Sequence, residues 1–307
     1  MVNKLLNLGN TCAINSLIQC INSCKLNVAL FDKPPNNTIA LALFELLHLM
    51  QIHDDKTIKP TNFLNYLYST FSTFKRRQQL DAQEVWTLLA NEVFTNISKD
   101  ITINKSFSSI LHKKAYDQII KHNNNKTSLW NDLFQGVILQ ILICQNCKNK
   151  KYTFETFYSI SLNIGDCIIS MLKEYFSKDI TDEIDCECCK QKSKQNKFIK
   201  FYKLPKFLII SLNRYNNLGQ KINLNIDINI NILLSNNILY DNQNKIELNL
   251  ISAINHFGSI NSGHYNAVDH NNKNIIDDDV IIPLQDESFY KENNSIYMLF
   301  YKINFVT

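Results

Sequence analysis

Near its start the chain reads Asn7-Leu8-Gly9-Asn10-Thr11-Cys12-Ala13-Ile14-Asn15-Ser16, and Leu17, Ile18 and Cys20 follow with the spacing of a buried helix face. This pattern predicts a helix with Cys12 at its N-terminus. Free N–H groups and the helix dipole favour a thiolate there, and a neighbouring imidazole lowers a cysteine pKa from about 8.5 to roughly 3.5–7.5. Asn7 is the candidate side-chain amide for holding an oxyanion. The alternative is a small buried hydrophobic cysteine, which this segment taken alone favours.

A histidine with a glycine-rich approach lies far downstream, in His256-Phe257-Gly258-Ser259-Ile260-Asn261-Ser262-Gly263-His264-Tyr265. His264 stands at the expected start of a strand, and Asp277, Asp278 and Asp279 follow after a polar turn. A nucleophile, a base and an acceptor that fixes the tautomer of the base are the minimum set for thiol acyl transfer. The spacing permits this set. A structural histidine beside a tyrosine and a solvated turn of aspartates are the alternatives.

Two Cys-x-x-Cys pairs form the third feature, Cys144-Gln145-Asn146-Cys147 and Cys186-Glu187-Cys188-Cys189. Two pairs with this spacing usually give Zn²⁺ four thiolates in a closed, structural site. A redox role for a single pair requires a βαβ context that is missing here, and it leaves the second pair unexplained. The pattern therefore predicts zinc bound by Cys144, Cys147, Cys186 and Cys189, with Cys188 as the alternative to Cys189.

Helical periodicity dominates the first hundred residues, most clearly at 39–50 and 81–94, and Pro60 and Thr61 open a third candidate helix. From Leu133 onward, short runs rich in β-branched and aromatic residues predict strands at 136–143, 152–162, 198–202, 207–212, 245–254 and 295–303. A helix is expected at 168–176, and the polar segment 100–130 is expected to be a helix or an insertion. Without repeats or a flexible linker, we expect an α+β fold with several lobes on one core.

The composition excludes several classes of protein. The 307 residues carry a formal net charge of only +4, with basic and acidic residues interspersed, which does not predict nucleic-acid binding. No apolar run is long enough for a membrane span, and the N-terminus does not resemble a signal peptide. Nine cysteines, an odd number, argue against a secreted disulfide framework. We expect an intracellular protein of the cytoplasm or nucleus, and a monomer.

These segments, in this order, resemble the ubiquitin-specific protease (USP) family. Residues 7–19 match its Cys box, and Gly263-His264-Tyr265 with Asp277-Asp278 match its His box. The stretch Gln79-Leu80-Asp81-Ala82-Gln83-Glu84 is similar to the family's Gln-x-Asp-Ala-x-Glu element. The other matches are Phe134-Gln135-Gly136, the two cysteine pairs, Glu155-x-Phe157, Lys203-Leu204-Pro205, Leu212-Asn213-Arg214-Tyr215 and the segment 297–301.

The resemblance implies a papain-like cysteine protease fold with a right-hand architecture. Residues 1–307 would form one catalytic domain, with a helical thumb at about 1–130, zinc-bearing fingers at about 133–215 and a β-rich palm mainly at 198–307. Carried over by position, the catalytic residues are Cys12 as nucleophile, His264 as general base, Asp277 as orienting acid, Asn7 as oxyanion amide and Asp278 in a polar or orienting role. The substrate-binding residues are Asp81, which would meet the basic tail of ubiquitin, Gln79, Glu84, His256, Tyr265 and Tyr215.

The implied activity is hydrolysis of isopeptide or peptide bonds at the C-terminal glycine of ubiquitin, with ubiquitinated proteins as partners. Residues that depart from the usual family pattern are Ala13, Val85, Asn213 and Ile276, none of which removes a group needed for thiol chemistry. Two alternatives stay open: a catalytically inactive ubiquitin-binding module, and a protease for another ubiquitin-like modifier. The matches fill the chain from 7 to 301, so we expect no accessory domain and a choice of targets made by surface loops.

Overall fold

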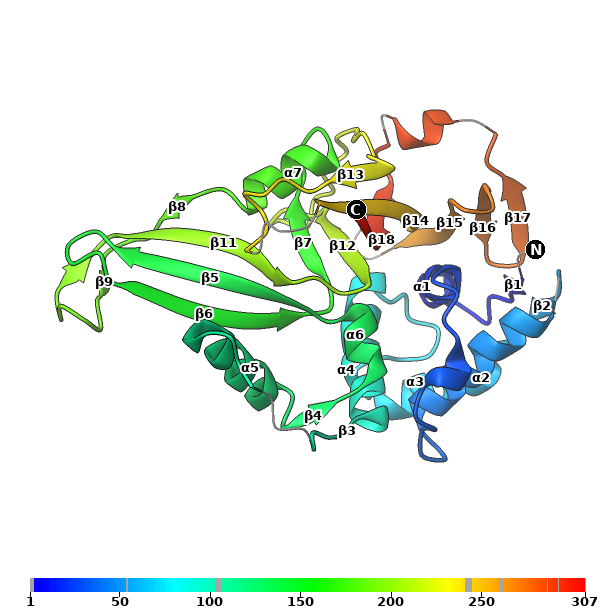
Figure 1. Ribbon diagram of the computed structural model, residues 1–307. Helices are drawn as coiled ribbons and strands as arrows, with labels where there is room; N and C mark the ends of the chain where they lie inside the picture. The colour runs from blue at the N-terminus through cyan, green and yellow to red at the C-terminus, as the bar shows by residue number, and fades with distance from the viewer. Residues whose placement is uncertain are drawn as a thin grey trace.

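The computed structural model describes residues 3–53, 55–102, 106–240, 245–259, 262–285, 287–291 and 293–306 (Figure 1). The helices in these ranges are α1 (Cys12–Ser23), η1 (Val28–Leu30), α2 (Ile39–Ile52), α3 (Thr61–Thr70), α4 (Ala82–Ile97), α5 (Ile110–His122), α6 (Leu129–Phe134), α7 (Ile168–Tyr175) and η2 (Glu287–Tyr290). The expected helices at 39–50, 81–94 and 168–176 are confirmed, and α1 begins at Cys12 as predicted. None of these helices combines the length and apolar character needed to cross a bilayer.

A large sheet forms the second half of the molecule, with the order β17-β16-β15-β14-β18-β12-β7, and β13 pairs with β14. Its strands are β7 (Ile160–Asn163), β12 (Phe207–Asn213), β13 (Asn231–Leu233), β14 (Lys245–Gly258), β15 (Gly263–Asp269), β16 (Asn274–Asp277), β17 (Val280–Pro283) and β18 (Ile296–Val306). All neighbouring pairs are antiparallel except β12 with β7. The antiparallel pairing places the start of β15 beside the end of β16, which brings His264 and Asp277 to the same end of these two strands.

A narrower sheet extends away from the helices as an arm (Figure 1). It has the order β6-β5-β11-β8, with β5 (Gly136–Cys144), β6 (Lys150–Phe157), β8 (Asp179–Ile180) and β11 (Gln195–Lys203). A small hairpin-like pair, β9 (Ile184–Asp185) with β10 (Lys192–Ser193), lies at the far end. The expected strand at 152–162 is two strands, β6 and β7, because the chain passes from the arm to the large sheet after Phe157.

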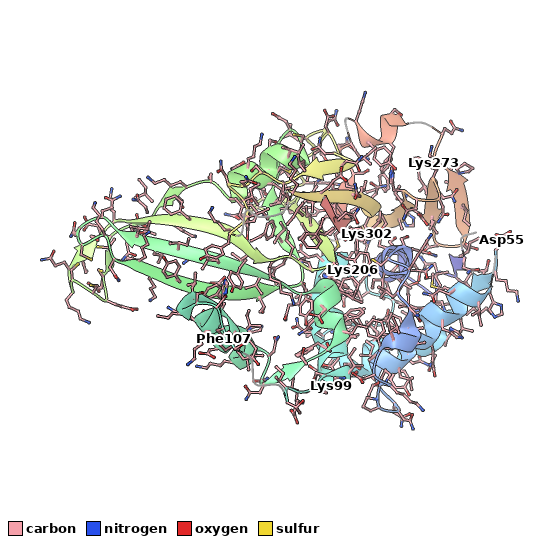
Figure 2. All side chains as sticks on the ribbon, in the orientation of Figure 1. Asp55, Lys99, Phe107, Lys206, Lys273 and Lys302 are labelled. Carbon is pink, nitrogen blue, oxygen red and sulfur yellow. The ribbon has the colours of Figure 1, made fainter. Side chains whose placement is uncertain are left out.

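The polar segment at 100–130 contains a helix, which was one of the two structures expected there. Helix α5 packs against β6 of the arm, and Phe107 lies ahead of it with its ring centroid 5.1 Å from that of Tyr116 (Figure 2). Short strands β3 (Lys99–Asp100) and β4 (Lys126–Thr127) pair at the base of this excursion. Another short pair, β1 (Lys4–Leu5) with β2 (Thr57–Ile58), is parallel and fixes the N-terminal segment.

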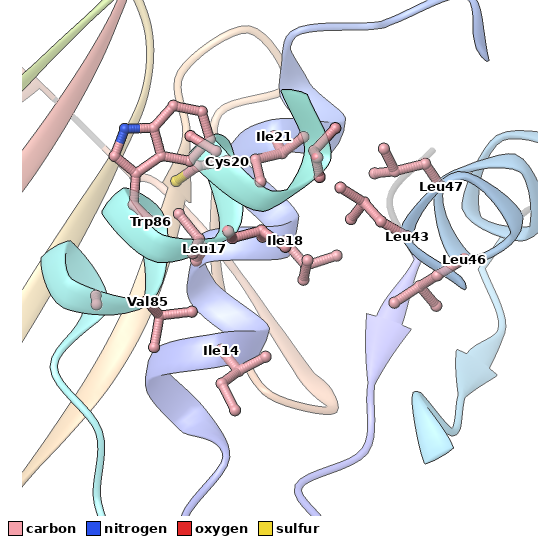
Figure 3. Packing of buried hydrophobic residues seen from close by; sticks show 14 of the residues in the cluster. Ile14, Leu17, Ile18, Cys20, Ile21, Leu43, Leu46, Leu47, Val85 and Trp86 are labelled. Atoms are coloured by element: carbon pink, nitrogen blue, oxygen red, sulfur yellow. The ribbon is translucent and has the colours of Figure 1, made fainter. Parts of the chain in front are cut away.

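Helix α1 lies in the centre of the core. Its residues from Cys12 to Ile21 are all buried, and Figure 3 shows Ile18 facing Leu43 of α2, with Val85 and Trp86 of α4 on another side. A helix that is covered all round is expected to be apolar on most faces, which explains the run of isoleucine and leucine in its sequence. This packing gives Cys12, at the first turn, a rigid support.

Tryptophans join the helices to the sheets. The indole of Trp86 donates a hydrogen bond to the carbonyl of Tyr158 at 3.1 Å, and its ring lies against Phe134 and Phe300. Trp130 donates to the carbonyl of Ala90 at 3.1 Å. Both indole N–H groups are therefore satisfied although both rings are fully buried, as buried tryptophan requires.

Candidate active site

Cys12 is the first residue of α1, and its side chain is 4% exposed. The sulfur faces the backbone N–H of Tyr265, the residue after His264, and the N–H groups of Ala13 and Cys12 at the helix N-terminus. Burial nevertheless raises the pKa of the Cys12 thiol above its ordinary value, and the negative charge of Asp278 raises this pKa further. The backbone N–H groups do lower the pKa of Cys12, as expected at a helix N-terminus, but loss of hydration outweighs them in this structure.

His264 is oriented by Asp277. The Nε2 atom of His264 lies 2.5 Å from Oδ1 of Asp277, and both side chains are partly exposed. This contact leaves Nδ1 as the ring nitrogen available for proton transfer. Within the described part of the chain, no hydrogen bond joins the imidazole of His264 to Cys12, whose sulfur faces the N–H of the next residue, Tyr265. Catalytic hydrogen bonds are often loose before a substrate is bound.

Asp278 connects the turn after β16 to the segment before α1. Its carboxylate accepts hydrogen bonds from Nδ2 of Asn7 at 2.8 Å and from Nδ2 of Asn15 at 2.7 Å, and its carbonyl accepts from the N–H of Leu5. Oδ1 of Asn7 in turn accepts from the N–H groups of Gly9 and Thr11. These contacts hold the Asn7 amide next to the first turn of α1, where the sequence places the oxyanion donor.

Asn15 is a site residue that the sequence analysis missed. It is 2% exposed in helix α1, one turn after Cys12, and it donates to Asp278. The sequence does carry a signal, because an asparagine among buried isoleucine and leucine residues needs a hydrogen-bond partner.

One cavity of about 480 Å³ gathers all six residues that were expected to bind substrate: Gln79, Asp81, Glu84, Tyr215, His256 and Tyr265. Asp81 caps α4 by accepting from the N–H groups of Gln83 and Glu84, and it also accepts from the hydroxyl of Tyr297. Tyr297 is a second residue that the sequence analysis did not assign to the site. We name this space, with Asp81 and Glu84 on its wall, the acidic cavity.

The histidine that lines the acidic cavity does not offset its negative charge. Burial, followed by the ammonium of Lys221, lowers the pKa of His256 to about 4, so its imidazole is neutral at pH 7. The hydroxyl of Tyr215 lies 2.8 Å from Nδ1 of this ring. With a neutral histidine and two carboxylates, the cavity favours a cationic or hydrogen-bond-donating ligand.

Gln79 ties the segment before α4 to the start of β15. Its amide both donates to the carbonyl of Gly263 and accepts from the Gly263 N–H, the latter at 2.8 Å. A Cβ atom at Gly263 would lie 2.3 Å from Nε2 of His256, so only glycine fits there. These close contacts hold the backbone beside His264.

Four cysteines lie together at the end of the arm. The sulfurs of Cys144, Cys147, Cys186 and Cys189 are all within 4.8 Å of one another, and this group can hold a metal ion. Cys188 is exposed and does not belong to the group. In each pair the first cysteine carbonyl accepts from the N–H of a lysine four residues later, Lys148 or Lys190, and both lysines have left-handed backbones. The two turns are thus equivalent in their backbone.

The model of the family described as "Ubiquitin carboxyl-terminal hydrolase" matches residues 3–301. The chain belongs to this hydrolase family. Among curated relatives, it is 27% identical to the probable ubiquitin carboxyl-terminal hydrolase 4 of Schizosaccharomyces pombe, over 97% of this chain and 58% of that protein. It is 24% identical to ubiquitin carboxyl-terminal hydrolase 2 of Bos taurus, over 86% of this chain and 48% of that protein. The chain thus spans about half the length of these two family members.

Solved structures of the hydrolase family support the fold. The chain is similar, with a TM-score of 0.74 and 21% identity, to the Ubp8 DUB module of SAGA bound to ubiquitin aldehyde, covering 100% of this chain and 70% of that chain. A structure of the same module with monoubiquitin gives a TM-score of 0.73 and 22% identity over the same shares. The expected α+β fold of the USP type is therefore confirmed.

Proposed function

We propose that this chain is a cysteine-type deubiquitinase that hydrolyses isopeptide or peptide bonds at the C-terminal glycine of ubiquitin. The observation that carries the proposal is the position of Cys12 at the N-terminus of α1, against the strand that bears His264, in a chain of the ubiquitin carboxyl-terminal hydrolase family. Relatives carry the name ubiquitin carboxyl-terminal hydrolase, and the neighbouring DUB module is bound to ubiquitin aldehyde.

In the proposed reaction, Nδ1 of His264 takes the thiol proton as Sγ of Cys12 attacks the glycine carbonyl. Asp277, bound to Nε2, stabilises the imidazolium that forms. The Asn7 amide and the N–H of Cys12 hold the oxyanion. His264 then protonates the leaving amine, a thioester joins ubiquitin to Cys12, and water attacks the thioester with His264 as its base. No hydrogen bond joins Cys12 to His264 among the described residues, so in this proposal that bond forms when substrate binds.

The acidic cavity is the proposed site for the ubiquitin tail. The resemblance to the USP family implies that Asp81 meets the basic tail of ubiquitin. The carboxylate of Asp81 can bind a guanidinium through both oxygens if the hydroxyl of Tyr297 moves away from it. Neutral His256 and the hydroxyls of Tyr215 and Tyr265 would line the rest of the tail.

We assign the thumb to about 1–130, the fingers to about 133–215 and the palm mainly to 198–307.

Zn²⁺ is the proposed metal of the fingers. A tetrahedral zinc ion with sulfurs at about 2.3 Å separates neighbouring sulfurs by about 3.8 Å. The sulfurs of Cys147 and Cys186 lie 3.7 Å apart, and those of Cys144 and Cys189 lie 4.0 Å apart, so the group fits this ion. Four thiolates leave no open position, and the ion would therefore supply folding free energy and take no part in the reaction.

The decisive experiment is reaction of the purified protein with ubiquitin carrying a C-terminal electrophile, followed by intact mass. We expect one ubiquitin-sized adduct on the wild-type protein and none on Cys12→Ala. Absence of an adduct from folded, metal-loaded protein would contradict the proposal. Probes built on other ubiquitin-like modifiers would then separate altered modifier selectivity from an inactive ubiquitin-binding module.

A further inference from the structure

A second, smaller cavity of about 220 Å³ borders the loop that leads into Cys12. Gly9 and Thr11 of that loop form one wall, Asn65 and Tyr68 of α3 form another, and Arg76 and Arg77 complete it. The segment at 73–81 contributes to both this cavity and the acidic cavity. We name the second one the basic cavity.

The basic cavity contains two arginines that have no acidic partner and a tyrosine hydroxyl that has no hydrogen-bond partner among the described residues. Arg76 and Arg77 are exposed, and neither forms an ion pair within the described part of the chain. Arg76 donates to Oδ1 of Asn65 at 2.8 Å and lies 5.2 Å from the centre of the Tyr68 ring. The hydroxyl of Tyr68 is buried and has no hydrogen-bond partner among the described residues. No aspartate or glutamate is among the described lining residues, so the cavity favours an anion.

The backbone of the arginine segment is bonded to the loop that leads into the nucleophile. Nδ2 of Asn10 donates to the carbonyl of Arg77 at 2.6 Å. Asn10 and Arg77 both have left-handed backbones, with φ of 55° and 62°, a conformation that residues other than glycine adopt less often. Such conformations persist where the surrounding contacts enforce them, and they cluster at functional sites. The nucleophile loop and the arginine segment therefore form one unit, only a residue away from Cys12.

We propose that the basic cavity binds acidic side chains of the protein whose lysine carries ubiquitin. This inference rests on the proposed function. If the basic ubiquitin tail occupies the acidic cavity, the lysine-bearing chain has to leave Cys12 by another path, and Thr11 places the basic cavity directly beside it. Each extended residue spans about 3.5 Å, so acidic residues within a few positions of the lysine are the ones that this path brings toward the arginines. Opposite charges in the two cavities thus orient the two halves of the conjugate.

Three substrates test this proposal. The first joins ubiquitin to the lysine of a peptide with aspartates on both sides, the second has asparagines in their place, and the third is a ubiquitin amide of a small fluorophore. For the wild-type protein at low salt we expect kcat/KM about three- to tenfold higher for the acidic peptide than for the neutral one, the size expected from exposed ion pairs. Because these charges are exposed, about 0.5 M salt should remove most of the preference.

The matched variants are Arg76→Gln with Arg77→Gln, and Lys273→Gln with Lys302→Gln. Each pair removes two exposed positive charges, and Figure 2 shows Lys273 and Lys302 on the large-sheet side of the molecule. The arginine pair should cleave both peptides at the same rate while its rate on the fluorophore amide stays within about twofold of the wild type. The lysine pair should keep the wild-type preference.

Two results would overturn the inference: equal rates of the wild-type protein on both peptides, or a preference that survives in the arginine pair. Failure of the wild-type protein to cleave even the fluorophore amide would instead contradict the proposed function. The fluorophore arm therefore separates the two failures.

Discussion

Cys12 and Cys144 are both buried thiols, yet their surroundings shift the pKa in opposite directions. Burial and Asp278 raise the pKa of Cys12 despite nearby backbone N–H groups. At Cys144 the hydroxyl of Ser193, 3.1 Å from the sulfur, and the N–H of Cys147 lower the pKa to about 6. Burial alone therefore does not decide thiol chemistry; the number and charge of the groups around the sulfur do. Not every thiol of the arm is shifted in this direction, because the pKa of Cys147 is raised. At Cys12 the raised pKa means that a base has to form the thiolate when it is used.

The largest predicted effect is the loss of activity when the base that serves Cys12 is removed. His264→Ala is expected to lower kcat/KM on a ubiquitin fluorophore amide by roughly 10⁴- to 10⁶-fold, because nothing else then takes the proton from the Cys12 thiol. The His264 side chain is 44% exposed, so the melting temperature should stay within about 2 °C of the wild type. A loss of less than tenfold would mean that another group is the base.

The arm thiols should matter for folding and not for chemistry. Cys147→Ser is expected to lose the bound metal and lower the melting temperature by at least about 10 °C, because ligand loss removes metal-linked folding free energy. Cys188→Ser is the matched control and should change neither quantity, since Cys188 lies outside the group of four sulfurs. Metal content and thermal unfolding measure both. Loss of metal from Cys188→Ser would show that the ligand set differs.

The amide beside Cys12 should have an intermediate effect. Asn7→Ala is expected to lower kcat about a hundredfold with little change in KM, as for the loss of one oxyanion donor. Steady-state kinetics on the fluorophore amide separate the two constants. A raised KM with unchanged kcat would instead assign Asn7 to substrate binding.

The smallest predicted effect is the pH dependence of Cys12 alkylation in the enzyme without substrate. Because the pKa of Cys12 lies above its ordinary value, alkylation of Cys12 by iodoacetamide should accelerate about tenfold per pH unit between about pH 6 and 8, as the thiolate fraction rises. Peptide mass mapping follows each cysteine separately. A rate that is already constant below pH 7 would reveal a thiolate at Cys12 and remove the contrast with Cys144.

Local patterns accounted for much of the fold. The apolar repeats at 39–50 and 81–94 predicted α2 and α4, because periodicity depends on residues only a few positions apart. The strand at 152–162 was misjudged, since an apolar run does not show where a chain changes from one sheet to another. Asn15 was missed because its partner, Asp278, lies 263 residues away.

By itself, the sequence determined the main helices and most of the long strands, the start of α1 at Cys12, the two cysteine pairs and the family. Only the tertiary structure decided that six residues from 79 to 265 line one cavity, that Cys189 and not Cys188 joins the sulfur group, and that burial raises the pKa of the Cys12 thiol. The reason is physical. Periodicity and caps depend on near neighbours, whereas burial, charge and hydrogen-bond partners depend on segments that meet only when the chain has folded.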